Sequence, residues 1–308
     1  MGQSKTKTNT HSYLDDSRNN DVQIYINGEY FARRDAKVSV FDSGFLLGDG
    51  VWEGIRLHNG TLLFLDEHID RLIDGAKALS IDIGLSSDGL KDTLADLIAR
   101  NDMISDVHIR LIVSRGIKTT PYQHPDATRP GATIVAIPEF KKPLPQLYDR
   151  GISLVSVSTR RGDARVLDPR INSLNKLNCI LGCIEADRKG ADEGLMLDLN
   201  GNVSTCNSTN FFFIKSGDLC TSDGVSCLNG ITRSKAIELA SSDGIRVRQE
   251  GFSIEDVYSA DEMFVTGTFA GILPATSIDG RSIPIGPITT RVRALYRDLI
   301  HKISGSDE

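Results

Sequence analysis

The stretch GFLLGDGVWEGIRLHNGTLLFLDEHIDRL, residues 44–72, carries two different hydrophobic patterns in succession. Its first part, up to Leu65, is dense in apolar and β-branched residues and predicts two strands. From Asp66 onward the apolar residues recur at helical spacing as far as residue 81, which predicts a helix capped by Asp66. Strands followed by a helix on one short segment indicate a mixed α and β fold.

Working outward from this stretch, the same patterns continue in both directions. VQIYINGEYFA (22–32) alternates around Asn27–Gly28, as β-hairpins do, and KVSVFD (37–42) is expected to continue the sheet. LKDTLADLIARN (90–101) predicts a helix, and VHIRLIVSRG and GATIVAIP predict strands. The sequence thus predicts a disordered tail at 1–20, a small α+β domain at 21–138, a proline-rich linker at 139–150 and a larger domain at 151–308.

Composition excludes several classes of function. The net charge is −6 and the basic residues are scattered, which argues against binding to nucleic acid or to an anionic membrane. No apolar run is long enough to span a bilayer. Five cysteines without a CxxC pair predict a reduced, cytoplasmic protein without a metal site.

The segment DPRINSLNKLNCILGCIEADRKG, residues 168–190, predicts a helix with Lys176 on its apolar side. At 3.6 residues per turn, Lys176 shares a face with Ile180, Cys183 and Ile184. A lysine at such a place either extends its amine to solvent or keeps a desolvated amine of lowered pKa, which suits Schiff-base chemistry.

Two further segments have the features of phosphate-binding turns. LNGITRSKAIELA places Gly230, Ile231 and Thr232 at the start of a helix, where backbone N–H groups are free. VTGTFAGI (265–272) offers small residues and hydroxyls after a strand, with close backbone approach at Gly267. With Arg71 and a candidate Schiff-base lysine, these turns suggest pyridoxal 5'-phosphate (PLP).

In order and spacing, residues 44–72, LNGITR and DEMFVTGTFAGILPATSIDG resemble the class IV (fold type IV) aminotransferases, which include branched-chain and D-amino-acid aminotransferases. The resemblance runs from about residue 22 to the C-terminus. It implies a two-domain α/β fold, PLP bound in the cleft between the domains, mainly by the large C-terminal one, and a homodimer. Glu53 would be structural. The resemblance also implies a set of site residues: the cofactor ligands Arg71, Gly230, Ile231, Thr232, Gly267 and Thr268, and the substrate pocket Trp52, Arg56, His108, Arg110, Phe269 and Ala270.

The chain departs from the family pattern at three places. Many relatives begin the catalytic helix with IKSLN, whereas this chain has INSLN, so that Asn172 replaces the usual lysine and Lys176 follows four residues later. We therefore expect Lys176 to carry the Schiff base. Thr205 stands where relatives have the glutamate that pairs with the pyridine nitrogen, and we expect it to be the neutral partner of that nitrogen.

The third departure concerns the substrate carboxylate. The Arg-x-His of D-amino-acid aminotransferases is missing, and Tyr122 and His124 stand at the most comparable spacing. We assign Tyr122 to the substrate pocket, but the sequence does not define the amino donor or the acceptor.

These features predict a PLP-dependent aminotransferase (EC 2.6.1.-) that moves an amino group between an amino acid or amine and a 2-oxo acid. Two alternatives stay open. One is a PLP-dependent lyase or racemase of the same fold, and the other is a PLP-binding protein with little turnover.

Overall fold

The structure is a computed structural model and describes residues 9–305. The chain divides into two compact units, each built on its own sheet. The six-stranded unit contains residues 15–142, 171–176 and 301–305, and the nine-stranded unit contains residues 9–14, 143–170 and 177–300. Mixed helices and strands agree with the predicted α/β class.

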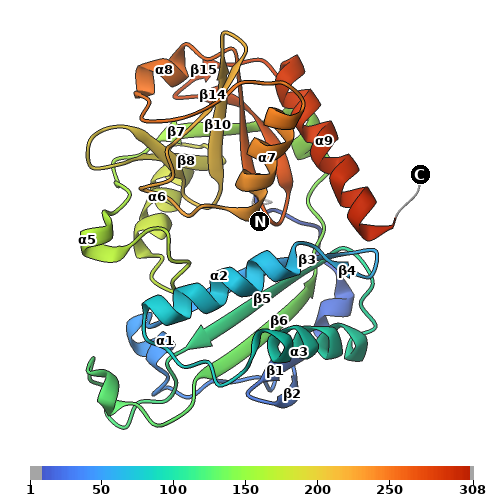
Figure 1. Ribbon diagram of the computed structural model, residues 1–308, viewed down its shortest axis with the longest axis vertical. Coiled ribbons are helices and arrows are strands. Elements are labelled where there is room, and N and C mark those ends of the chain that lie inside the picture. Colours follow the sequence, from blue (N-terminus) through green and yellow to red (C-terminus); the bar gives the residue numbers. More distant parts are fainter. Residues whose placement is uncertain (1–8, 306–308) are drawn as a thin grey trace, which may run out of the picture. The chain divides into compact units, whose positions relative to one another are not determined.

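The six-stranded unit holds an antiparallel sheet in the order β2-β1-β6-β5-β3-β4 (Figure 1). Its strands are β1 (Gln23–Ile26), β2 (Glu29–Ala32), β3 (Gly50–His58), β4 (Thr61–Leu62), β5 (Val107–Ser114) and β6 (Thr133–Phe140). The predicted hairpin at Asn27–Gly28 is confirmed: both residues have positive φ, as a tight two-residue turn requires.

Two helices cover one face of this sheet. They are α2 (Leu65–Ala78) and α3 (Ser87–Arg100). Leu72 and Leu94 are buried against the odd-numbered residues of β3 and β5, such as Ile55 and Ile109. Because side chains alternate along a strand, the even-numbered residues of β3 and β5 lie on the opposite face. Four of the predicted substrate residues lie on that face: Trp52, Arg56, His108 and Arg110.

Two local predictions in this unit are wrong. KVSVFD and the start of GFLL form no strand: residues 37–42 are irregular, and a short helix, α1 (Ser43–Leu47), follows. The side chain of Asp42 caps α1 by accepting bonds from the N–H groups of Gly44 and Phe45, which favours a helix here. Asp66 lies in the first turn of α2 and is not its cap, because the helix begins one residue earlier.

The nine-stranded unit holds a mixed sheet in the order β12-β11-β10-β13-β14-β7-β8-β9, with β15 beside β14 (Figure 1). Its strands are β7 (Ile152–Ser156), β8 (Glu193–Leu197), β9 (Val203–Cys206), β10 (Asn210–Lys215), β11 (Asp218–Thr221), β12 (Val247–Gln249), β13 (Glu262–Gly267), β14 (Gly271–Ile278) and β15 (Arg281–Ser282). Its helices are α4 (Gln146–Arg150), α5 (Ala164–Leu167), α6 (Leu177–Arg188), α7 (Ile231–Ser242), α8 (Ile254–Tyr258) and α9 (Pro287–Ser304), the last as far as Ile300.

The helix predicted around Lys176 begins later than expected. α6 starts at Leu177, so Lys176 precedes it. Residues 172–174 are extended because they pair with the start of β3 through a bridge between Ser173 and Val51. Ile180 and Ile184 are exposed, so the expected apolar face does not surround Lys176.

The N-terminal segment also differs from the expected tail. Residues 1–8 lie outside the described part of the chain, but residues 9–20 have definite contacts. A short 3-10 helix, η1 (Ser17–Asn20), places the Asn19 side chain in hydrogen bonds with both backbone groups of Phe140. Thr10 is 2% exposed and donates to Glu193. Paired polar groups of this kind can order a segment that has few apolar residues.

Candidate active site

The segment 171–176 is held in the six-stranded unit by backbone pairing with β3. The N–H of Trp52 donates to the carbonyl of Asn172 at 2.9 Å, and the N–H of Leu174 donates to the carbonyl of Gly50 at 2.9 Å. A Cβ at Gly50 would lie 2.7 Å from the Leu174 side chain, so only glycine leaves room for this approach. Lys176 is thereby placed near the first residues of β3.

The Lys176 amine lies beside the asparagine that replaces the usual lysine. Its Nζ donates to Asn172 Oδ1 at 3.1 Å and lies 5.6 Å from the centre of the Trp52 ring. Asn172 is buried, and its Nδ2 donates to the Trp52 carbonyl at 2.6 Å. The asparagine in the usual lysine position therefore fixes the amine that follows it four residues later.

Trp52 also joins Lys176 to the predicted substrate residues. The Arg110 guanidinium lies 3.8 Å from the centre of the Trp52 ring, and the His108 ring lies so close to Gly54 that a Cβ there would be 3.0 Å away. Cross-strand register places Trp52, His108 and Arg110 on the face opposite α2 and α3. Burial lowers the pKa of Arg110 against the opposing influence of Glu139, so its cation is partly desolvated.

Arg56 lies on the same face as these residues but is engaged elsewhere. Its Nη2 is 3.4 Å from an oxygen of Asp106. The predicted role of Arg56 in the substrate pocket stays a prediction, and the structure shows that its guanidinium also has a carboxylate partner, Asp106.

Arg71, predicted to bind phosphate, forms a fork with a buried carboxylate. Its Nε and Nη2 donate to the two oxygens of Glu53 at 2.8 and 2.7 Å, and His68 Nδ1 lies 2.6 Å from the same carboxylate. Glu53 is 0% exposed. Burial alone would raise the pKa of Glu53, but the hydrogen bonds from His68 and Arg71 outweigh it and hold this pKa below its ordinary value. The ionised carboxylate in turn orients Arg71.

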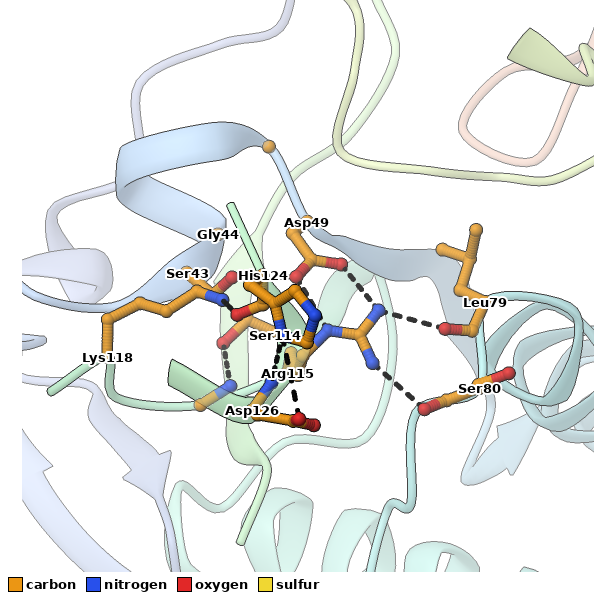
Figure 2. A network of polar contacts seen from close by, with 12 residues as sticks. Ser43, Gly44, Asp49, Leu79, Ser80, Ser114, Arg115, Lys118, His124 and Asp126 are labelled. Atoms are coloured by element: carbon orange, nitrogen blue, oxygen red, sulfur yellow. Dashed lines mark hydrogen bonds and ion pairs between the residues drawn. The ribbon is translucent and has the colours of Figure 1, made fainter. Parts of the chain in front are cut away.

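A second polar network fixes the entry to β3 (Figure 2). Arg115 binds Asp49 at 2.7 and 3.0 Å and donates to the carbonyls of Leu79 and Ser80. Ser43 donates to Asp49 at 2.7 Å. α1 and the first residues of β3 are therefore tied to β5 and to the end of α2.

Tyr122 lies in the loop between β5 and β6 and is exposed. It stacks on His124, with ring centres 6.3 Å apart. The buried Lys118 amine donates to the His124 carbonyl at 3.1 Å and holds the loop from within (Figure 2). The role of Tyr122 in substrate binding stays a prediction.

In the nine-stranded unit, the start of α7 has the features of an anion site. The cap residue is Gly230, in an extended conformation, and no side chain caps the first N–H groups, which belong to Ile231 and Thr232. A Cβ at Gly230 would lie 2.2 Å from Asn210 Oδ1, so a larger residue would displace Asn210. Free N–H groups at the positive end of a helix attract phosphate.

The turn after β13 contains the other predicted cofactor residues. Gly267 ends the strand and pairs with Gly271 across the turn, and Thr268 is half-buried there. The Thr266 hydroxyl is buried and has no hydrogen-bond partner among the described residues. Phe269 is buried, and the Ala270 carbonyl accepts a bond from the Tyr148 hydroxyl at 2.8 Å.

Thr205 is buried between two polar neighbours. Its hydroxyl donates to the Thr209 carbonyl at 2.7 Å, and Asn210 Nδ2 lies 3.5 Å from the same oxygen. No carboxylate of the described residues is hydrogen-bonded to Thr205. The role of Thr205 as the partner of the pyridine nitrogen stays a prediction.

The sequence analysis did not identify a buried acid, Glu193, that is hydrogen-bonded to Thr209. Glu193 is 1% exposed and accepts bonds from the hydroxyls of Thr10, Ser208 and Thr209. Burial raises the pKa of Glu193, although these hydroxyls oppose the shift. A signal was present: Glu193 directly precedes the apolar strand residues GLML, where a charge is unusual.

Comparison with known proteins agrees with this fold. Residues 50–278 match the family model of amino-transferase class IV, and the chain belongs to that family. A putative branched-chain-amino-acid aminotransferase of Methanocaldococcus jannaschii is 42% identical over 90% of this chain and 96% of its own length. A D-alanine aminotransferase of Listeria monocytogenes is 33% identical over 93% of this chain and 99% of its own length.

Solved structures give the same result. The branched-chain amino acid aminotransferase of Escherichia coli superposes with a TM-score of 0.85, at 31% identity, covering 94% of this chain and 96% of that one. An aminotransferase from Brucella abortus bound to PLP has a TM-score of 0.79, at 26% identity, covering 91% of this chain and 99% of that one.

PLP is the cofactor of this family, and the residues present suit it. The uncapped start of α7, the glycine that a Cβ would block and the unpaired Thr266 hydroxyl suit an anionic group. Lys176 provides an amine beside an aromatic ring. Among residues 9–305 there is no helix long and apolar enough to cross a membrane.

Proposed function

We propose that this class IV aminotransferase binds PLP covalently through Lys176 and transfers an amino group to a 2-oxo acid. The observation that carries the proposal is the placement of the Lys176 amine, 3.1 Å from the side chain of the asparagine that replaces the usual lysine. An extended lysine side chain from position 176 therefore reaches the immediate surroundings of residue 172.

We assign a separate role in the reaction to each of these residues. When bound, PLP withdraws electrons from the substrate Cα and so makes its proton acidic. Lys176 Nζ is the group that takes this proton and returns it, with Asn172 Oδ1 orienting the amine. Arg71, the start of α7 and Thr268 would hold the phosphate, while Gly267 leaves space for the backbone to approach it.

Borohydride trapping tests the proposal directly. The purified protein is incubated with PLP, reduced, digested and mapped by mass spectrometry. The pyridoxyl mass should appear on Lys176, and the buried Lys118 serves as the internal control that should stay unmodified. A label on a different lysine, or an unlabelled protein, would refute the assignment.

The substrate class follows from Arg110. Its partly desolvated guanidinium stacks on Trp52, and no described residue forms an ion pair with it. A cation in this state favours a carboxylate ligand, so we propose an amino acid as donor in preference to a simple amine. A panel of L-amino acids, D-amino acids and (R)-amines, each with 2-oxo acids, distinguishes these donors. Conversion of simple amines alone would contradict the proposal.

Thr205→Glu is expected to change the absorption spectrum of the bound cofactor. If the Thr205 hydroxyl turns from the Thr209 carbonyl to donate to the pyridine nitrogen, it is a neutral partner, so this nitrogen should be largely unprotonated, whereas a carboxylate would keep it protonated. The spectrum and the rate of the first half-reaction are measured across pH, with Ser204→Ala as the control on the same strand. An unaltered spectrum and rate in Thr205→Glu would remove Thr205 from this role.

We further propose a cytoplasmic homodimer. All five cysteines are free thiols, as a reducing compartment allows. Residues 38–47 expose a run of large apolar side chains, and Phe45 is 69% exposed. Such a patch on a single chain marks a contact surface.

The dimer proposal has a simple test. Phe45→Glu should convert the dimer to a monomer by light scattering, because it places a charge in the apolar patch. Ile104→Glu, at an exposed isoleucine in the loop between α3 and β5, is the control and should leave the mass unchanged. A wild-type protein that is monomeric at micromolar concentration would contradict the proposal.

A further inference from the structure

The N-terminal arm, residues 9–14, belongs to the nine-stranded unit and is linked to two turns next to predicted cofactor or substrate residues. One turn connects β9 to β10 and follows Thr205. The other follows β13 and contains Thr268 and Phe269. The arm ends in a backbone bridge between Tyr13 and Pro143, so its course over the unit is anchored at a second place.

Thr10 contacts the first turn through Glu193. Its hydroxyl and the Ser208 hydroxyl donate to the same carboxylate oxygen, and Thr209 donates to the other at 2.5 Å. Among the described residues, no cation is paired with Glu193, so these hydroxyls, together with the Cys206 thiol, satisfy the buried carboxyl group. Loss of one donor would leave a buried acceptor short of a partner, which is costly.

Thr209, which donates to Glu193, also contacts two of the proposed cofactor residues. Its carbonyl accepts the bond from Thr205, and its methyl group lies so near Gly267 that a Cβ there would be 3.3 Å away. Glu193 therefore orders a residue that touches both turns.

His11 contacts the second turn. Its ring stacks on Phe269 with ring centres 6.0 Å apart and planes 12° apart. Phe269 directly follows Thr268, so the neighbouring arm residues Thr10 and His11 reach different turns.

We infer that Thr10 and His11 are positioning residues for cofactor and substrate, and that the arm and PLP bind the nine-stranded unit cooperatively. The inference rests on the proposed PLP site. Thr10 acts through Glu193 and Thr209 on Thr205 and Gly267, and His11 acts through Phe269 on the substrate side. Coupling between two binding events is reciprocal, so PLP should in turn hold the arm in place.

The first experiment measures PLP affinity by titration of absorbance. Thr10→Val keeps the shape of the side chain and removes the hydroxyl, and we expect affinity to fall about 3- to 10-fold. Thr10→Ser should restore it. Ser12→Ala is the matched control, because among residues 9–305 the Ser12 hydroxyl bonds only to Asn9, within the arm. Unchanged affinity in Thr10→Val would overturn the inference while leaving the proposed function intact.

The second experiment needs no variant. Hydrogen exchange of residues 9–14 is measured in the wild-type chain with and without PLP, and slower exchange is expected with PLP bound. Identical exchange despite demonstrated PLP binding overturns the inference alone. A wild-type chain that does not bind PLP overturns both the inference and the proposed function.

Steady-state kinetics then separates the two arm residues. His11→Ala should raise KM for the amino donor about 3-fold with little change in kcat, since it alters the position of Phe269 and not the reacting groups. An unchanged KM contradicts the role of His11.

Discussion

Lys176→Ala is expected to lose essentially all transamination, by at least about 10²–10⁴-fold, because the only proposed proton-transfer group is removed. Some PLP binding should remain, since the phosphate contacts lie in other residues. Activity is measured as keto acid formed, and PLP content is measured by absorbance. Lys176→Arg should be equally inactive, because a guanidinium keeps its proton and is a poor nucleophile.

Two further variants sharpen this test. Lys77→Ala, at an exposed lysine on α2, is the control and should behave as wild type. Asn172→Lys combined with Lys176→Ala places the amine at the position usual in the family. That double variant should take the borohydride label at residue 172. Full activity in Lys176→Ala would refute the catalytic role.

Arg71→Ala is expected to lower the free energy of unfolding by about 3–5 kcal/mol, because it removes the fork that satisfies the buried Glu53 carboxylate. PLP affinity should fall about 10- to 100-fold if Arg71 also binds phosphate. Denaturant unfolding of the apo-protein and PLP titration measure the two effects separately. Arg100→Ala, which breaks the exposed pair with Asp96, is the control and should cost about 1 kcal/mol or less.

The same cluster predicts a pH dependence of stability. The pKa of Glu53 is lower in the folded chain than in the unfolded one, so the unfolded state binds the proton more readily. The stabilisation is therefore fully present above the unfolded pKa of about 4.5 and is lost as the pH falls through the folded value. Glu53→Gln should flatten this acid limb of the Tm profile. A profile identical to wild type would show that the carboxylate does not contribute in this way.

Elements made by neighbouring residues followed from the sequence. The Asn27–Gly28 turn, the helical spacing of apolar residues after Leu65 and the helix that begins within LNGITR depend on local backbone preferences and on periodicity, which a single segment contains. The resemblance to the family added the expected substrate residues, such as Trp52 and Arg110.

Long-range pairing was beyond such reasoning. The segment 172–174 has the composition of a helix start, but it bonds to Trp52 and Gly50 in β3, which lie about 120 residues earlier in the sequence. This pairing keeps the segment extended, so Lys176 precedes α6. Glu193 likewise finds its partner Thr10 far away in the sequence. Both contacts exist only once the sheets are formed.

The sequence by itself thus determined the fold class, the local elements and the types of residue available for chemistry, because these depend on side-chain patterns within short segments. The tertiary structure alone decided which amine lies beside Asn172, which carboxylate orients Arg71 and which residues satisfy Glu193. Hydrogen bonds between buried polar groups require partners that the chain brings together from distant positions, and no local pattern records those partners.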